Sequence, residues 1–125
     1  MTSRLSKAHL SNTLRAAALA APLLFVASGA LAHAHILKAN PAENAVISAP
    51  AVLHLEFSEK LEPKFSGVEL MKASGTPVPV ASKAIGAAID ATPKAALAPG
   101  AYMVMWHALS VDGHKSSGDY NFTVK

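Results

Sequence analysis

The period of the hydrophobic pattern is the feature that most limits how this chain can fold. From residue 102 to 107, Tyr102, Val104 and Trp106 alternate with three other residues. A period of two places successive side chains on opposite faces, which is typical of a half-buried β-strand. The same alternation occurs in three other runs: Val52–Phe57, Gly67–Lys72 and Tyr120–Val124. The pattern therefore predicts an all-β fold built from short strands.

Three further runs are weaker strand candidates: His35–Lys38, Val78–Ala81 and Ala88–Ala91. Pro, Gly, Asn and Ser separate the runs, and Asn40-Pro41-Ala42-Glu43-Asn44 is typical of a turn. Several short strands at roughly even spacing favour one antiparallel β-sandwich. The only helix signal is the alanine-rich Ala81–Ala88, which Gly86 and the flanking prolines limit to a turn or two.

The run Leu97-Ala98-Pro99-Gly100-Ala101-Tyr102 has the pattern of a tyrosine corner. In that motif, a Tyr entering a strand bonds its hydroxyl to the backbone a few residues upstream. This run supports the sandwich prediction independently of the alternating pattern.

The first 32 residues have the pattern of a signal peptide. Arg4, Lys7 and Arg15 precede an apolar run that ends in Ala30-Leu31-Ala32, an A-x-A cleavage signal. A retained membrane anchor is the alternative, but the run is shorter than the ~20 apolar residues of a spanning helix. We therefore expect cleavage after residue 32, a single domain over residues 33–125, and export to the periplasm.

The composition of the remaining chain excludes several classes of function. Eight of the 11 basic residues and all 8 acidic residues follow residue 32, so this part carries no net charge with neutral histidines. It therefore lacks the basic patch that a nucleic-acid partner would require. The chain has no cysteine, which excludes thiolate metal sites, cysteine nucleophiles and disulfides. We expect a monomer held together by packing alone.

Cleavage would make His33 the first residue, with both an imidazole and a free α-amine. The first position of a mature chain has no structural need for histidine, so this placement indicates a function. The amine and Nδ1 of one histidine can chelate a divalent metal, and a second imidazole completes a histidine brace. Such nitrogen-rich, thiol-free sites favour Cu(II), which has the highest affinity among the divalent first-row metals.

The second imidazole is expected from Ser110-Val111-Asp112-Gly113-His114. Asp112 and His114 are two residues apart, so both point to one side of an extended segment. With His33 they would supply three nitrogens and one oxygen in the tetragonal geometry that Cu(II) prefers. Glu59 is a candidate for a weak axial oxygen or for a residue that orients a ligand. By itself, however, an Asp-Gly-His triplet in a loop is typical of a turn.

A competing local mode uses His33-Ala34-His35. A free amine, two backbone amides and the imidazole of His35 can bind Cu(II) even in an unstructured peptide. A strand that starts at Ile36 and Leu37 would commit those amides and disfavour this mode.

Other candidate ligands have simpler explanations. His54 and His107 lie opposite the apolar residues of their strands, so we expect solvated surface histidines. Met103 and Met105 share a strand face and could hold Cu(I) through thioethers, although packing is the commoner role of such a pair.

The chain resembles the CopC family of periplasmic copper-resistance proteins over essentially all of residues 33–125. The segments that carry the resemblance are His33, Asn40-Pro41-Ala42-Glu43, Leu55-Glu56-Phe57-Ser58-Glu59, Phe65-Ser66-Gly67, Leu97-Ala98-Pro99-Gly100-Ala101-Tyr102, Trp106, Ser110-Val111-Asp112-Gly113-His114, Gly118 and Phe122. No single segment is specific to this family, but the combination of all of them is.

The resemblance implies an Ig-like Greek-key β-sandwich or barrel of cupredoxin-like topology. It implies Cu(II) held by His33, Asp112 and His114 with Glu59 nearby, and a CopD-type inner-membrane copper importer as partner. The methionine-rich loop that binds Cu(I) in some members has no counterpart, because no methionine lies between Met71 and Met103. A protein that carries Cu(II) alone is therefore expected.

Two other function classes fit parts of the pattern. A copper monooxygenase also uses a histidine brace on an Ig-like core, but a carboxylate at Asp112 would fill the coordination position that its oxygen chemistry needs. A metal-free Ig-like interaction module would explain the strands and the tyrosine corner. It would leave His33 and the pair Asp112 and His114 without a role, so we expect a copper carrier and not an enzyme.

Overall fold

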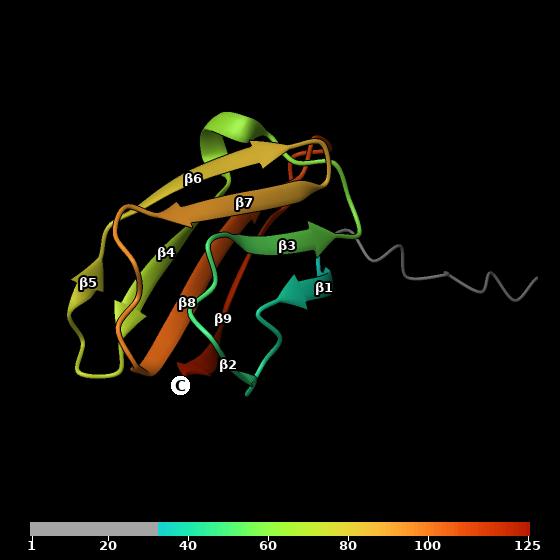
Figure 1. Ribbon diagram of the computed structural model, residues 1–125. Helices are drawn as coiled ribbons and strands as arrows, with labels where there is room; N and C mark the ends of the chain where they lie inside the picture. The colour runs from blue at the N-terminus through green and yellow to red at the C-terminus, as the bar shows by residue number, and fades with distance from the viewer. Residues whose placement is uncertain (1–32) are drawn as a thin grey trace, which may run out of the picture.

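The computed structural model describes residues 33–125 and shows two β-sheets packed face to face (Figure 1). The first sheet has the order β1-β3-β7-β6 and is antiparallel throughout. Its strands are β1 (Ile36–Asn40), β3 (Leu53–Phe57), β7 (Ala88–Pro93) and β6 (Val80–Ile85).

The second sheet has the order β2-β9-β8-β4-β5. Its strands are β2 (Val46–Ile47), β9 (Lys115–Val124), β8 (Gly100–Leu109), β4 (Gly67–Lys72) and β5 (Pro77–Val78), and one 3-10 turn, η1 (Pro63–Phe65), precedes β4. All pairs are antiparallel except β2 with β9, which is parallel. The all-β sandwich prediction is confirmed, with this one parallel pair as an addition.

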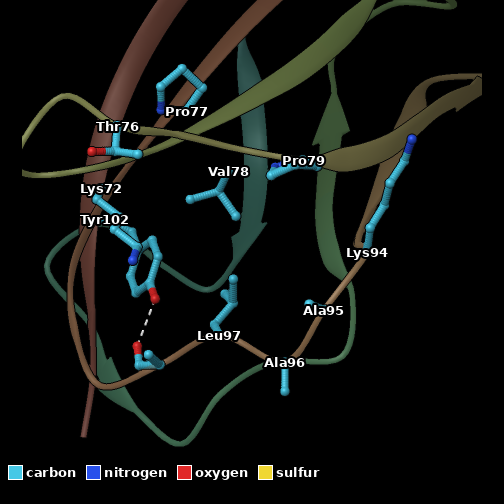
Figure 2. A pocket seen from close by; sticks show the side chains of 11 residues that line it. Lys72, Thr76, Pro77, Val78, Pro79, Lys94, Ala95, Ala96, Leu97 and Tyr102 are labelled. Carbon is cyan, nitrogen blue, oxygen red and sulfur yellow. Dashed lines mark hydrogen bonds between the residues drawn. The ribbon is translucent and has the colours of Figure 1, made fainter.

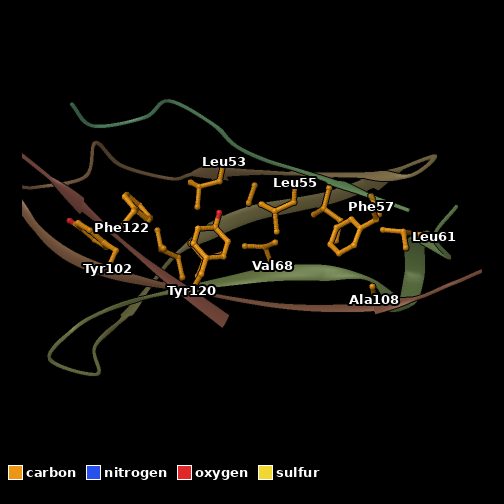
Figure 3. Packing of buried hydrophobic residues seen from close by; sticks show 14 of the residues in the cluster. Leu53, Leu55, Phe57, Leu61, Val68, Tyr102, Ala108, Tyr120 and Phe122 are labelled. Atoms are coloured by element: carbon orange, nitrogen blue, oxygen red, sulfur yellow. The ribbon is translucent and has the colours of Figure 1, made fainter. Parts of the chain in front are cut away.

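The core fills the space between the two sheets (Figure 3). Every alternating run contributes the face that the sequence predicted: Leu53, Leu55 and Phe57 from β3, Val68 and Leu70 from β4, Tyr102 and Val104 from β8, and Tyr120, Phe122 and Val124 from β9. Burial of this apolar surface is the main favourable term that holds a disulfide-free domain together.

The tyrosine corner is confirmed at the start of β8. The hydroxyl of Tyr102 donates a hydrogen bond of 2.6 Å to the carbonyl of Ala98, drawn as a dashed line in Figure 2. The ring lies against a surface hollow lined also by Leu97 and Val78. This bond fixes the loop that leads from the first sheet into the second.

The helical interpretation of Ala81–Ala88 is wrong. Residues 80–85 form β6, which turns at Gly86 and Ala87 and pairs with β7. Gly86 has a φ of 61°, which suits a two-residue hairpin turn. Alanine favours helix only weakly in so short a segment, and the backbone bonds to β7 decide the outcome.

The predicted signal peptide lies outside the described residues. Within residues 33–125, no helix has the length and apolar character needed to span a membrane.

Candidate metal site

The segment that leads into β1 is tied to two other parts of the fold. The amide of His35 donates to Ser58 Oγ at 3.1 Å, and the amide of Ser58 donates back to the carbonyl of His35 at 2.9 Å. On the other side, the hydroxyl of Ser116 donates to the carbonyl of Ala34 at 2.8 Å. Ala34 itself is only 2% exposed. These contacts fix the position of His33 beside the start of β9.

His33 and His114 are neighbours in space although 81 positions separate them in the chain. Their ring centroids lie 5.6 Å apart with an interplanar angle of 79°. Two imidazoles on one metal, at about 2.0–2.1 Å per nitrogen, have centroids roughly 4.5–6.5 Å apart. The separation of the two rings is therefore compatible with a shared ion.

The loop between β8 and β9 is organised by Ser110, which is 1% exposed. Its Oγ lies 2.5 Å from Asp112 Oδ1 and 3.1 Å from the carbonyl of His114. Gly113 has a φ of 93°, a left-handed conformation in which a glycine is favoured. The loop is thus a tight turn that presents Asp112 and His114 on the surface.

The carboxylate of Asp112 contacts His114 directly. Oδ1 lies 3.1 Å from Nδ1 of His114 and accepts a hydrogen bond of 3.3 Å from its amide. The hydrogen bond from Ser110, followed by that from His114, lowers the pKa of Asp112 to about 2. Asp112 is therefore ionised at any physiological pH and offers its second oxygen to a cation.

The candidate ligands lie close together, but not in the arrangement that a bound metal requires. Nδ1 of His33 lies 3.2 Å from the carbonyl of Lys115, to which it donates in this conformation. Within residues 33–125, no three or more His, Cys, Asp or Glu side chains form a ready group around one point. A brace would need the His33 ring to release Lys115, which costs one exposed hydrogen bond of about 0.5–1.5 kcal/mol. The chemistry of these groups, imidazole nitrogen and carboxylate oxygen, is therefore compatible with a metal ion once the His33 ring turns away from Lys115.

Glu59 lies in the loop that follows β3 and is half-buried. Its chain neighbours bond to both sides of the site: Ser58 to His35, and the carbonyl of Lys60 to the amide of Val111. The backbone of Glu59 thus passes between the start of β1 and the β8–β9 loop. A role for its carboxylate at the metal stays a prediction.

The two surface histidines differ from each other. His107 is exposed, as expected. His54 is not simply solvated, because its Nδ1 lies 2.5 Å from Asp90 Oδ1 and its Nε2 lies 3.2 Å from Glu56 Oε1. The bond to Asp90 is the main cause that raises the pKa of His54, with a smaller contribution from Glu56. The sequence predicted a solvated His54 because Asp90 lies on β7, 36 positions away in the chain.

Three serines near the site were not singled out from the sequence. Ser58 and Ser116 anchor the segment before β1, and Ser110 anchors the loop that carries His114. Serine is common in loops, so only the place of Ser110 in the Ser-Val-Asp-Gly-His run was a signal. Ser58 and Ser116 bond to backbone groups far along the chain, which no local pattern reveals, whereas Ser110 bonds within its own loop.

The comparison with known proteins identifies the class. The family model described as the CopC domain matches residues 36–125, and the chain therefore belongs to the CopC family. Copper resistance protein C of Xanthomonas campestris pv. juglandis is 38% identical over 107 residues, covering 78% of this chain and 84% of that protein. The name of that relative describes copper resistance and not a catalysed reaction.

Two further relatives bear on the fold and on the role. The crystal structure of PcoC, a methionine-rich copper resistance protein from Escherichia coli, matches with a TM-score of 0.70 and 35% identity over 75% of this chain and 100% of that one. The copper transport protein CutJ of Bacillus subtilis is 32% identical over 107 residues. That match covers 82% of this chain but only 20% of CutJ, which is a much longer protein.

Proposed function

We propose that this protein is a periplasmic carrier of Cu(II) that serves copper resistance, copper homeostasis or delivery of copper to a membrane importer. The observation that supports it best is the edge-to-face pair of His33 and His114, at 5.6 Å between ring centroids. Each histidine is exposed, and each is held in place by bonds from buried or half-buried residues. Such an accessible pair can exchange an ion with a partner.

The proposed ligands are the α-amine and Nδ1 of His33, the imidazole of His114 and the carboxylate of Asp112, with Glu59 near the axial position. Nitrogen and carboxylate ligands without thiolate favour Cu(II) in tetragonal geometry. In this conformation Asp112 contacts Nδ1 of His114 and leaves Nε2 free for the metal. Coordination of the same ion by the Asp112 carboxylate requires that this contact opens, and otherwise Asp112 orients the His114 ring. The ionised Asp112 also offsets part of the charge of a divalent cation.

The local mode through His33-Ala34-His35 is disfavoured by the bonds around it. It would require the amide of His35 as a deprotonated ligand, and that amide donates to Ser58 in the fold. Strand β1 starts at Ile36, directly after this segment. The peptide could bind copper in this way only if it left the domain.

The leader pattern in residues 1–32 supports export to the periplasm, with His33 as the new terminus. The likeness to one part of the longer protein CutJ supports a copper transport protein as partner, which for a separate domain would be a CopD-type inner-membrane importer. A partner of this kind would receive the ion from the exposed histidine pair.

The test uses the mature protein, starting at His33 with a free amine, titrated with Cu(II) against a competing chelator. We expect His114→Ala to bind Cu(II) at least about 100-fold more weakly, since loss of a direct ligand should exceed the 10–100-fold cost of outer-shell changes. His35→Ala is the matched control, and it should bind like the wild type. Equal binding by wild type and His114→Ala, with loss in His35→Ala, would show that the terminal peptide and not the folded site holds the metal.

A second form of the protein tests the amine. A chain that keeps Ala32 before His33 retains both imidazoles and Asp112 but has no α-amine at His33. The proposal expects a large loss of Cu(II) affinity in this extended form. Unchanged affinity would exclude the brace and leave a simple two-histidine site.

A further inference from the structure

A surface hollow of about 310 Å³ lies at the start of β8, where the chain crosses twice between the two sheets (Figure 2). Pro79 joins β5 of the second sheet to β6 of the first, and residues 94–99 join β7 of the first sheet to β8 of the second. Figure 2 shows the side chains of Val78 and Leu97 facing each other across the hollow. Leu97 and Tyr102 belong to the core and also line the hollow, so the edge of the core is open here.

Hydrogen bonds fix the walls of this hollow. The amide of Lys72 donates to the carbonyl of Thr76 at 2.8 Å and closes the turn between β4 and β5. The amide of Lys94 donates to the carbonyl of Pro79 at 3.0 Å and joins the two crossings. The bond from Tyr102 to Ala98 holds the remaining side. The hollow is therefore preformed, and binding of a ligand would require little ordering of the protein.

The lining combines an apolar surface with positive charge. Of its 11 residues, only Lys72, Thr76 and Lys94 are polar, and none is acidic. Lys72 ends β4 in phase with the buried Val68 and Leu70, so the alternation of the strand directs its side chain toward the inner face. The strand period that buries two core residues thus also brings a cation to the hollow.

The two lysines are free to attract an anion. Among residues 33–125, neither Lys72 nor Lys94 forms an ion pair with a carboxylate. Glu69 lies on the opposite face of β4, and Asp90 on β7 is bonded to His54. An apolar hollow beside unpaired cations suits a molecule with one aliphatic part and one negative charge. At ~30 Å³ for each water-sized group, 310 Å³ has room for roughly ten heavy atoms.

We propose that this hollow binds a medium-chain aliphatic carboxylate, with its chain against Val78, Leu97 and Tyr102 and its carboxylate paired with Lys72. Burial of the chain supplies most of the favourable free energy, and Lys72 selects an anion over a cation of the same length. The site is separate from the histidine pair. Tyr102 precedes the end of β8 at Leu109 by seven residues, about 23 Å along the strand.

The test is a titration of isotope-labelled mature protein with octanoate in the absence of metal, followed by amide NMR shifts. We expect saturable shifts at Val78, Leu97 and Tyr102, with a dissociation constant in the millimolar range that is ordinary for so small a ligand. Lys72→Glu should weaken octanoate binding at least about 5-fold, because the attraction of an exposed ion pair becomes a repulsion of similar size. Octylammonium, which has the same chain and the opposite charge, should bind the wild type more weakly than octanoate by a similar factor.

Lys64→Glu is the matched control, because Lys64 is also exposed but lies on η1 and does not line the hollow. It should bind octanoate like the wild type. The proposal would be overturned by an absence of saturable shifts at the hollow, by equal binding of octylammonium, or by unchanged affinity in a folded Lys72→Glu protein. Should that variant unfold, Lys72→Gln decides in the same way, because it removes the charge and keeps a polar side chain.

A Cu(II) titration of Lys72→Glu separates this site from the proposed carrier function. Its Cu(II) affinity should match that of the wild type, and a loss would contradict the separation of the two sites. A protein that binds octanoate but not Cu(II) would refute the carrier function alone.

Discussion

Ser110 offers a direct test of how the fold supports the histidine site. Its hydroxyl is buried and lies 2.5 Å from Asp112 Oδ1. In Ser110→Ala the loop would lose this bond and the 3.1 Å contact with the carbonyl of His114. That carbonyl keeps the amide of Ser110 as a donor at 2.9 Å, so it is not left unsatisfied.

The expected magnitudes differ for stability and for copper binding. Loss of one buried hydroxyl bond should lower the free energy of unfolding by about 0.5–1.5 kcal/mol. If Ser110 orients the proposed metal ligands, its loss should weaken Cu(II) binding by about 10–100-fold. The pKa of Asp112 should rise from about 2 toward its ordinary value, because Ser110 is the largest cause of the shift. At pH 7 this carboxylate stays ionised in both proteins, so the loss of affinity would come from position and not from charge.

The assay is a Cu(II) competition titration at pH 7, with urea unfolding of the same samples. Ser48→Ala is a suitable control, because Ser48 is exposed and follows β2, which pairs with the end of β9 farthest from the loop. Unchanged Cu(II) affinity in a folded Ser110→Ala protein would refute the reasoning. It would mean that the orientation of Asp112 and His114 does not control the site.

Three further predictions concern the fold. Tyr102→Phe should lose about 0.5–1.5 kcal/mol in urea unfolding, since it removes only the hydroxyl bond of the tyrosine corner; no loss would deny that bond an energetic role. Gly118→Ala should cost about 1–3 kcal/mol, because an ideal Cβ there would lie 2.8 Å from the ring of Trp106. Trp106 is the only tryptophan, so its fluorescence reports the strain, and an unchanged spectrum and midpoint would contradict the packing. His54 has a raised pKa because of Asp90, so its contribution to stability should be present below pH 6.5 and lost as pH rises through the raised value. His54→Gln should flatten that slope in pH-dependent unfolding, and an identical slope would count against it.

Much of the fold could be predicted from the sequence because the signals that indicate strands are local. The period of two in β3, β4, β8 and β9 identified the buried face of each strand, and the tyrosine corner was found from a six-residue run. The local signals failed where they were weak. The alanine-rich Ala81–Ala88 became a strand and a turn because its partner β7 supplied the backbone bonds.

The candidate site, too, was predicted from the sequence only in part. The sequence by itself indicated His33, Asp112 and His114 as potential ligands, because the cleavage pattern and the Asp-Gly-His run are local. Only the tertiary structure brought His33 beside His114, through bonds from Ser116 and Ser58 to the segment before β1. It also decided that Asp90 meets His54 and that Met71 meets Met103. These contacts depend on strand register, which the packing of the whole core fixes and which no short stretch of sequence encodes.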